Sequence, residues 1–120
     1  MSIYQEGKDS TFTHNGKTWP LDPFLARAAK LPVKKVPADR LRWNLDLAGP
    51  ADSATVERIR KADTSIPILY TIDPKWGYVV VDGWHRLNKV LLVEHKNAVL
   101  GKEIPQSWFL EISMEDEQNS

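Results

Sequence analysis

The sequence lacks cysteine altogether, and this absence removes several classes of chemistry at once. A chain without cysteine cannot form disulfide bonds, thiolate metal sites or a thiol nucleophile. Long hydrophobic runs are also absent, because no apolar stretch approaches the roughly 20 residues of a membrane-spanning helix. The polar segment 1–8 has no apolar core of the kind found in signal peptides. We therefore expect a soluble, cytoplasmic protein with no membrane partner.

The chain also lacks an excess of either charge, since 16 Lys and Arg residues balance 16 Asp and Glu residues. Bulk electrostatics therefore gives no argument for avid, non-specific binding to nucleic acid. The charge is unevenly distributed, with 10 basic against 7 acidic residues in 1–60 and 6 against 9 in 61–120. A local basic site in the first half of the chain is compatible with this balance.

A chain of 120 residues with 42% hydrophobic residues is long enough for one domain with a modest core. We divide it into three segments. Residues 1–30 are expected to form an N-terminal hairpin and a short helix, and residues 31–112 the main domain. Residues 113–120 have almost no apolar content and carry three consecutive acids, so we expect a disordered acidic tail.

Turn and cap residues indicate where the elements begin and end. Asn15-Gly16 favours a hairpin turn, and Asp22 is a candidate N-cap, with Pro23 at the first helical position. Residues 40–46 are ambiguous. The other expected elements are a strand over 31–36, a turn at 37–39, a helix from 52 or 53 to 62 with Val56 and Ile59 inward, strands over 66–72 and 78–81, a helix over 84–94 and a last strand over 108–112. This order predicts an α+β fold with a small mixed sheet and flanking helices.

One junction between a strand and a helix combines several features that favour bound phosphate. The buried strand ends at Asp82-Gly83, and the helix begins at once with Trp84, His85 and Arg86. The first N–H groups of a helix have no partner within the helix and carry partial positive charge, so they bind anions. Glycine lets a phosphate approach the backbone, the guanidinium matches phosphate oxygens, and imidazole exchanges protons near neutral pH.

Lys89 adds a positive charge one helical turn after this junction, which gives a sixth residue for the site. A purely structural interpretation competes with this one. In that case Asp82 caps the helix, His85 is an ordinary surface histidine, and Arg86 pairs with an acidic side chain such as Glu94 or Asp63.

The segment Val79–Arg86 resembles the signature of the ParB/sulfiredoxin superfamily, in which a strand runs into a Gly-x-His-Arg type of motif that opens a helix. The segment Ile66-Pro67-Ile68 is similar to the strand that precedes the motif in that superfamily, and the resemblance covers roughly residues 31–112. It implies a ParB/sulfiredoxin-like fold and a bound nucleotide (ATP, ADP or CTP), with Mg²⁺ as a further candidate. The residues that it implies for the phosphates are Gly83, Trp84, His85 and Arg86, with Arg58 on the preceding helix as a secondary candidate.

The activities implied by the resemblance are phosphoryl transfer or hydrolysis of a nucleoside triphosphate, with His85, Arg86 and Asp82 as candidate catalytic residues. Sulfiredoxin chemistry is excluded, because those enzymes carry cysteine where Trp84 stands here. A helix-turn-helix region like that of the partition proteins would not fit in the roughly 25 residues that follow the helix. Kinase relatives use an acidic residue to activate the acceptor hydroxyl, and the candidates for that residue here are Asp39, Asp46 and Asp82.

The main alternative is a nucleic-acid-binding module or nuclease that grips backbone phosphates at the same junction. A basic cluster beside Trp43 fits this alternative, although solvated lysines on an edge strand are the commoner explanation of such a cluster; its members are Lys34, Lys35, Arg40 and Arg42. A small interaction protein with a vestigial pocket is a third interpretation, and a homo-oligomer stays open. A histidine metal site is not expected, because His14, His85 and His95 lie far apart in the sequence.

Overall fold

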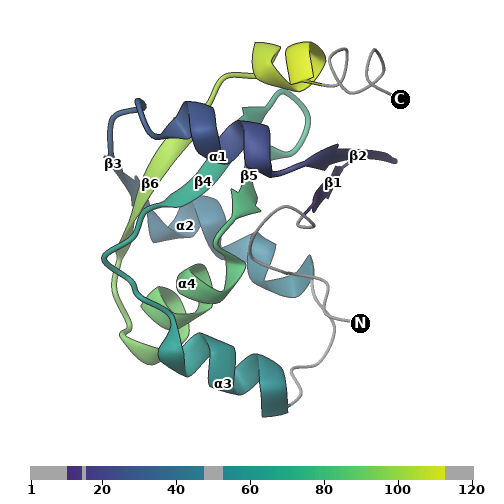
Figure 1. Ribbon diagram of the computed structural model, residues 1–120. Coiled ribbons are helices and arrows are strands. Elements are labelled where there is room, and N and C mark those ends of the chain that lie inside the picture. The colour runs from purple at the N-terminus through teal and green to yellow at the C-terminus, as the bar shows by residue number, and fades with distance from the viewer. Residues whose placement is uncertain (1–10, 15, 48–52, 113–120) are drawn as a thin grey trace.

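The computed structural model describes residues 11–14, 16–47 and 53–112 (Figure 1). Its labelled elements are β1 (Thr11–His14), β2 (Lys17–Pro20), α1 (Asp22–Ala28), β3 (Lys34–Pro37), α2 (Ala38–Leu41), the 3₁₀ helix η1 (Arg42–Leu47), α3 (Ser53–Lys61), β4 (Ile68–Asp73), β5 (Gly77–Asp82), α4 (Trp84–Asn88), the π-helix η2 (Lys89–Val93) and β6 (Ala98–Ile104). Residues 107–112 are also helical. The predicted α+β class is confirmed.

The main sheet has four strands in the order β3-β6-β4-β5, and β1 and β2 form a separate two-stranded sheet. β4 runs parallel to β6, whereas the pairs β3–β6 and β4–β5 are antiparallel. The sheet is therefore mixed. β4 and β5 are joined by a tight turn, and β5 leads directly into α4, so the predicted strand-turn-strand-helix order is confirmed.

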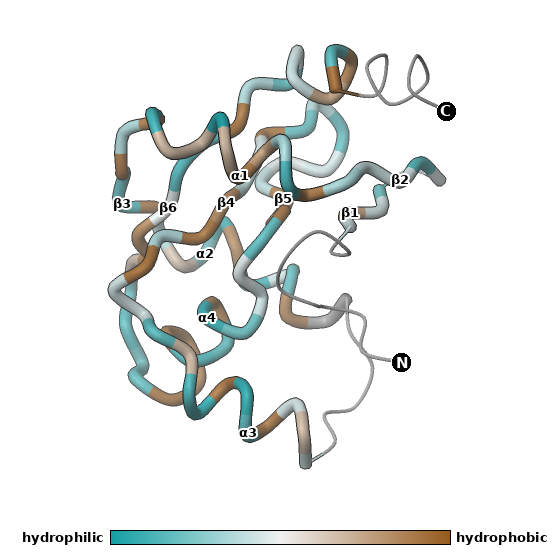
Figure 2. The backbone as a smooth tube through the Cα atoms, in the orientation of Figure 1, coloured by the Kyte–Doolittle hydropathy of each residue, from teal (hydrophilic) through white to brown (hydrophobic). Residues whose placement is uncertain are grey.

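Side chains on the two faces of the main sheet belong to two separate hydrophobic clusters. Along β4 the faces alternate, because Leu69 packs with the hairpin and α1 while its neighbours Ile68 and Tyr70 pack with α4. Figure 2 shows the hydrophobic stretches of the strands running through the centre of the molecule. The helix 84–94 was expected to bury its i, i+3 and i+4 positions, and all three are buried in the second cluster: Leu87, Val90 and Leu91.

The N-terminal hairpin packs against the helical segment 107–112. The indole N–H of Trp19 donates to the carbonyl of Phe109 at 2.8 Å, and the rings of Phe12 and Phe24 surround the Phe109 ring. Gly16 has a φ of +78°, as the predicted turn requires. Asp22 is the first helical residue rather than the N-cap, which is Leu21.

The prediction of a strand over 108–112 is wrong, because this segment is helical. Phe109 and Ile112 are buried in the first cluster, whereas Leu110 between them is 68% exposed. A strand would place residues 110 and 112 on the same face, whereas a helix brings the i and i+3 positions together. On α3, Val56 was predicted to face inward but is 46% exposed. The apolar spacing of this helix therefore predicted more burial than the structure shows.

The segment predicted as a turn and an ambiguous stretch forms α2 and η1, and its central residue is Asn44. The amide of Asn44 is fully buried and has three hydrogen bonds: it donates to the carbonyls of Leu41 (3.1 Å) and Tyr78 (3.0 Å) and accepts from the N–H of Val80 (3.0 Å). Two of these bonds go to the outer edge of β5. A side chain thus takes the place of a neighbouring strand along that edge.

The predicted acidic tail at 113–120 and the candidate cap Asp52 lie outside the described residues. The predicted strand over 31–36 begins later than expected, at residue 34. Within the described part of the chain, no helix is both long and apolar enough to cross a membrane.

We predict that Asn44→Ala lowers the free energy of unfolding by roughly 2–5 kcal/mol, because it leaves two part-buried backbone groups of β5 without a hydrogen-bond partner. Urea denaturation followed by circular dichroism measures this loss. Asn97→Ala, at an exposed position, is the matched control and should change stability by less than about 0.5 kcal/mol. A loss at Asn44 no larger than at Asn97 would show that the β5 edge does not need the amide.

The turn between β4 and β5 is held by Asp73, which gives a second prediction. Its carboxylate accepts from the N–H groups of Trp76 and Lys75 and from Nε2 of His14 at 3.1 Å. These contacts lower the pKa of Asp73 below its ordinary value of 3.8, and the hydrogen bond from the N–H of Trp76 is the largest cause. A depressed pKa stabilises the fold at pH values above 3.8, and this contribution disappears as the pH falls through the folded-state value.

Asp73→Asn should therefore flatten the loss of stability between about pH 4 and about pH 2, measured by urea denaturation at each pH. Asp39→Asn, at an exposed carboxylate, should leave the acid dependence as it is in the parent protein. If the free energy of unfolding falls equally steeply with decreasing pH in the parent and in Asp73→Asn, the role assigned to Asp73 is contradicted.

Candidate functional site

The junction between β5 and α4, which we call the β5–α4 turn (residues 82–86), depends on the backbone of Gly83. Gly83 has a φ of +100°, a left-handed conformation that residues with side chains rarely adopt. A Cβ atom at this position would lie 2.9 Å from Cγ2 of Ile68 and 3.0 Å from Nη2 of Arg86. The site therefore requires glycine for two independent reasons, and α4 begins immediately after it.

Arg86 folds back beneath Gly83 and is held by two protein oxygens. Nη1 donates to the carbonyl of Pro67 at 2.8 Å, and Nη2 donates to Oδ2 of Asp82 at 2.9 Å. The side chain of Arg86 is 15% exposed and that of Asp82 is 6% exposed, so this is a nearly buried ion pair. The guanidinium predicted to clamp phosphate thus joins the start of β4 to the end of β5.

The two residues between them lie closer to the surface. Trp84 and His85 are both half-buried, and their rings meet edge to face with centroids 5.5 Å apart. The indole N–H of Trp84 donates to the carbonyl of Asn44 at 3.1 Å, which ties α4 to η1. The indole is therefore anchored by the protein and supports the imidazole of His85.

Lys89 is held at the end of α3 rather than at the β5–α4 turn. The ammonium of Lys89 donates to the carbonyls of Arg60 (2.6 Å) and Ala62 (2.9 Å), at the C-terminal end of α3. A lysine in this position satisfies carbonyl groups that the helix leaves without partners. Arg58 is exposed on α3 itself. The contacts of Lys89 give no support to its predicted role, while the role of Arg58 stays a prediction.

Two of the three candidate acidic residues pair with arginines. Asp39 is exposed and pairs with Arg42 at 3.5 Å, while the side chain of Asp46 lies outside the described residues. The N-cap of α4 is Gly83 rather than Asp82. Because Asp82 is nearly buried and neutralised by Arg86, it does not fit the needs of a Mg²⁺ ligand. In the described part of the chain, no three His, Asp or Glu residues are grouped to hold a metal ion.

Sequence reasoning missed Asn44 and the carbonyl of Pro67, which together fix the two sides of the β5–α4 turn. A single asparagine in a stretch of ambiguous periodicity carries no signal, and a backbone carbonyl carries none at all. In the basic cluster predicted near Trp43, Lys34 pairs with Glu103 and Arg42 with Asp39, and the Trp43 ring stacks on that of Trp76.

Comparison of the chain with family models, with curated proteins and with solved structures found no match.

We predict that Arg86→Ala destabilises the protein by about 3–5 kcal/mol, because it leaves the carboxylate of Asp82 buried without its partner. The double variant Asp82→Asn/Arg86→Ala removes both charges and should recover part of that loss. Urea denaturation of Arg86→Ala, of Asp82→Asn and of the double variant gives the coupling. Losses that simply add would contradict a direct interaction between the two side chains.

Proposed function

We propose that this chain is a ParB/sulfiredoxin-like nucleotide-binding domain that holds nucleotide phosphates at the β5–α4 turn and acts in phosphoryl transfer or hydrolysis. The observation that carries the proposal is the left-handed Gly83 between a buried strand and a helix, followed by a half-buried histidine. Its position agrees with the motif on which the sequence resemblance rests.

The main chain supplies the first set of donors for phosphate. The first helical bond runs from the N–H of Leu87 to the carbonyl of Gly83 at 2.9 Å. The N–H groups of Trp84, His85 and Arg86 precede that bond and have no carbonyl partner within the helix. α4 continues into η2, so the N-terminal end of a ten-residue helical segment faces the turn. Such an end favours anions.

His85 supplies the side-chain contact, and Arg86 acts through the backbone. The imidazole of His85 is braced by Trp84, so it can donate to a phosphate oxygen in a fixed orientation. Arg86 and Asp82 are positioning residues in this proposal, because their ion pair fixes the conformation of Gly83. This arrangement revises the roles expected from the sequence, in which both residues were candidate catalytic residues.

The chemistry asked of such a site is mainly positioning and neutralisation of charge. The terminal phosphoryl group passes from the nucleotide to a hydroxyl or to water, while the donors hold the developing negative charge. Because Asp82 does not fit Mg²⁺, we derive no step through a metal ion.

The test is isothermal titration calorimetry with ATP, ADP and CTP, using the parent protein and two matched variants. His85→Asn should weaken binding by roughly 10- to 100-fold, the amount expected for one hydrogen bond to a charged group. His95→Asn makes the same substitution at the end of η2, where His95 has a φ of +53° that asparagine tolerates, and should leave affinity unchanged.

Titrations with a nucleotide and with a short oligonucleotide at several salt concentrations distinguish nucleotide binding from the nucleic-acid alternative. A contact with a DNA or RNA backbone should lose affinity steeply with added salt, whereas a compact nucleotide site should lose less. The proposal fails if none of the three nucleotides binds to the parent protein, or if His85→Asn binds them as tightly as the parent does.

A further inference from the structure

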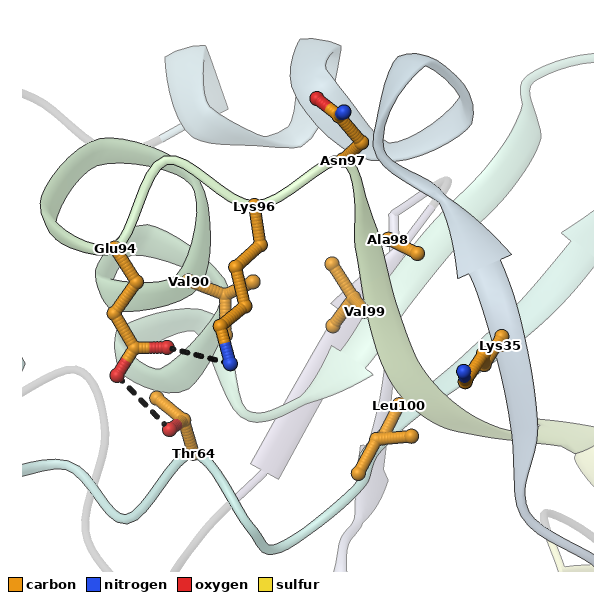
Figure 3. Close-up of a pocket in the computed structure, with 9 residues that line it drawn as sticks. All are labelled: Lys35, Thr64, Val90, Glu94, Lys96, Asn97, Ala98, Val99 and Leu100. Carbon is orange, nitrogen blue, oxygen red and sulfur yellow. Dashed lines mark hydrogen bonds and ion pairs between the residues drawn. The ribbon is translucent and has the colours of Figure 1, made fainter.

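The groove that Figure 3 shows beside η2 has a cavity volume of about 440 Å³, but its carboxylate is already engaged within the protein. Oε2 of Glu94 accepts from the hydroxyl of Thr64 at 3.1 Å, and Oε1 is enclosed from solvent, 3.8 Å from the ammonium of Lys96. A second pocket, with a cavity volume of about 350 Å³, lies where the β1–β2 hairpin meets the end of β4 and residues 106–110. We call it the hairpin pocket.

The hairpin pocket and the β5–α4 turn lie at opposite ends of the same strands. Asp73 pairs with Gly77 at the pocket end of β4, whereas Leu69 pairs with Asp82 at the other end. In Figure 1 the connection between β4 and β5 lies near the C-terminal helical segment, with α4 at the other end of β5. A ligand in the hairpin pocket is therefore independent of the function proposed for the turn.

The strand register brings four side chains of the hairpin to one face, and this face lines the pocket. Phe12 and His14 lie two residues apart on β1, so they share a face. Trp19 and Lys17 stand directly opposite them on β2, on that same face. The pair His14–Lys17 lies next to the hairpin turn, and the aromatic pair lies one step farther along the strands. A polar end and an apolar end thus adjoin in one pocket.

The apolar end is built from aromatic rings and one exposed leucine. The Phe109 ring meets that of Trp19 edge to face, with centroids 5.2 Å apart, and it lies 5.8 Å from that of Phe12. These rings leave little of their surface to the pocket, whereas Leu110 beside them is 68% exposed. Aromatic rings favour further rings at their edges and faces, so this end suits a flat apolar group.

At the polar end, His14 has one ring nitrogen in use and one that is available. Nε2 lies 3.1 Å from Oδ2 of Asp73, and the His14 side chain is 19% exposed. Hydrogen bonds, chiefly from the N–H of Trp76, hold the pKa of Asp73 below its ordinary value, so this carboxylate only accepts. The proton between them therefore belongs to Nε2, and in the neutral imidazole Nδ1 is an acceptor. Nδ1 has no hydrogen-bond partner among the described residues.

Lys17 places a positive charge next to this acceptor. It is exposed, and it forms no ion pair within the part of the chain that the structure describes. The negative charge of Asp73 is shared among three donors of the protein, namely His14 and the N–H groups of Lys75 and Trp76. The pocket therefore offers a ligand one acceptor and one cation, side by side.

We propose that the hairpin pocket binds a small α-hydroxy carboxylate with an aromatic side chain. The hydroxyl of the ligand donates to Nδ1 of His14, its carboxylate pairs with Lys17, and its ring lies on Leu110 beside the aromatic wall. The hydroxyl and the carboxylate must be neighbours in the ligand, because His14 and Lys17 are neighbours across the hairpin. A cavity of about 350 Å³ is at the lower end of the range for small-molecule sites.

The experiment is an NMR titration of the ¹⁵N-labelled protein with phenyllactate, and with two matched ligands that each lack one group. We expect phenyllactate to bind with a Kd on the order of 1 mM, with shifts concentrated in the hairpin and in residues 106–110. Phenylpropionate lacks the hydroxyl and should bind about fivefold more weakly, the effect of one ordinary hydrogen bond. Lactate lacks the ring and should bind at least about tenfold more weakly.

Three variants assign these differences to named side chains. His14→Gln keeps an amide donor for Asp73 but lacks Nδ1, so phenyllactate should lose its advantage over phenylpropionate. Lys17→Met keeps the apolar stem without the charge and should weaken both ligands by about threefold or more. Lys75→Met removes the same charge outside the pocket lining and should bind as the parent does. Circular dichroism melts confirm that each variant is folded.

The proposal is overturned if phenyllactate causes no shifts at about 10 mM, which is well above the expected Kd. It is also overturned if phenylpropionate binds the parent protein as tightly as phenyllactate does, or if Lys17→Met keeps the affinity of the parent. The comparison of ligands on the parent protein decides the role of the hydroxyl even if His14→Gln does not fold.

Discussion

The ion pair between Arg86 and Asp82 is the interaction on which the β5–α4 turn depends. Arg86 donates hydrogen bonds to the carboxylate of Asp82 at the end of β5 and to the carbonyl of Pro67, just before β4. Nη2 of the guanidinium lies 3.0 Å from the position that a Cβ of residue 83 would take, so the pair and the glycine depend on each other. Buried ion pairs add little net stability but are costly to break on one side. We infer that this pair specifies the shape of the turn rather than the overall stability of the fold.

The sequence carried most of the information needed for the local elements near this turn. The β-branched run over 78–81, the Asp82-Gly83 dipeptide and the apolar spacing after it predicted a strand, a tight turn and a helix, all of which are present. The helix at 107–112 was not predictable in the same way. Trp108-Phe109-Leu110 suits a strand by intrinsic preference, and only packing against the hairpin and α1 decides for a helix.

The candidate site was predicted in position but not in the direction of its side chains. The pattern placed Gly83, Trp84, His85 and Arg86 together, and they are adjacent at the turn. It could not show which way a long guanidinium points, because that depends on oxygens brought in from β4 and β5. The same holds for the ammonium group at residue 89, which serves the end of α3 across a tertiary contact.

The most direct test of the account follows the backbone amides of the β5–α4 turn by ¹⁵N NMR during a titration with ADP. The account predicts that the N–H signals of Trp84, His85 and Arg86 shift most, since these groups would face the phosphates. Shifts that appear only elsewhere, or no shifts at saturating nucleotide, would contradict a phosphate site at this turn.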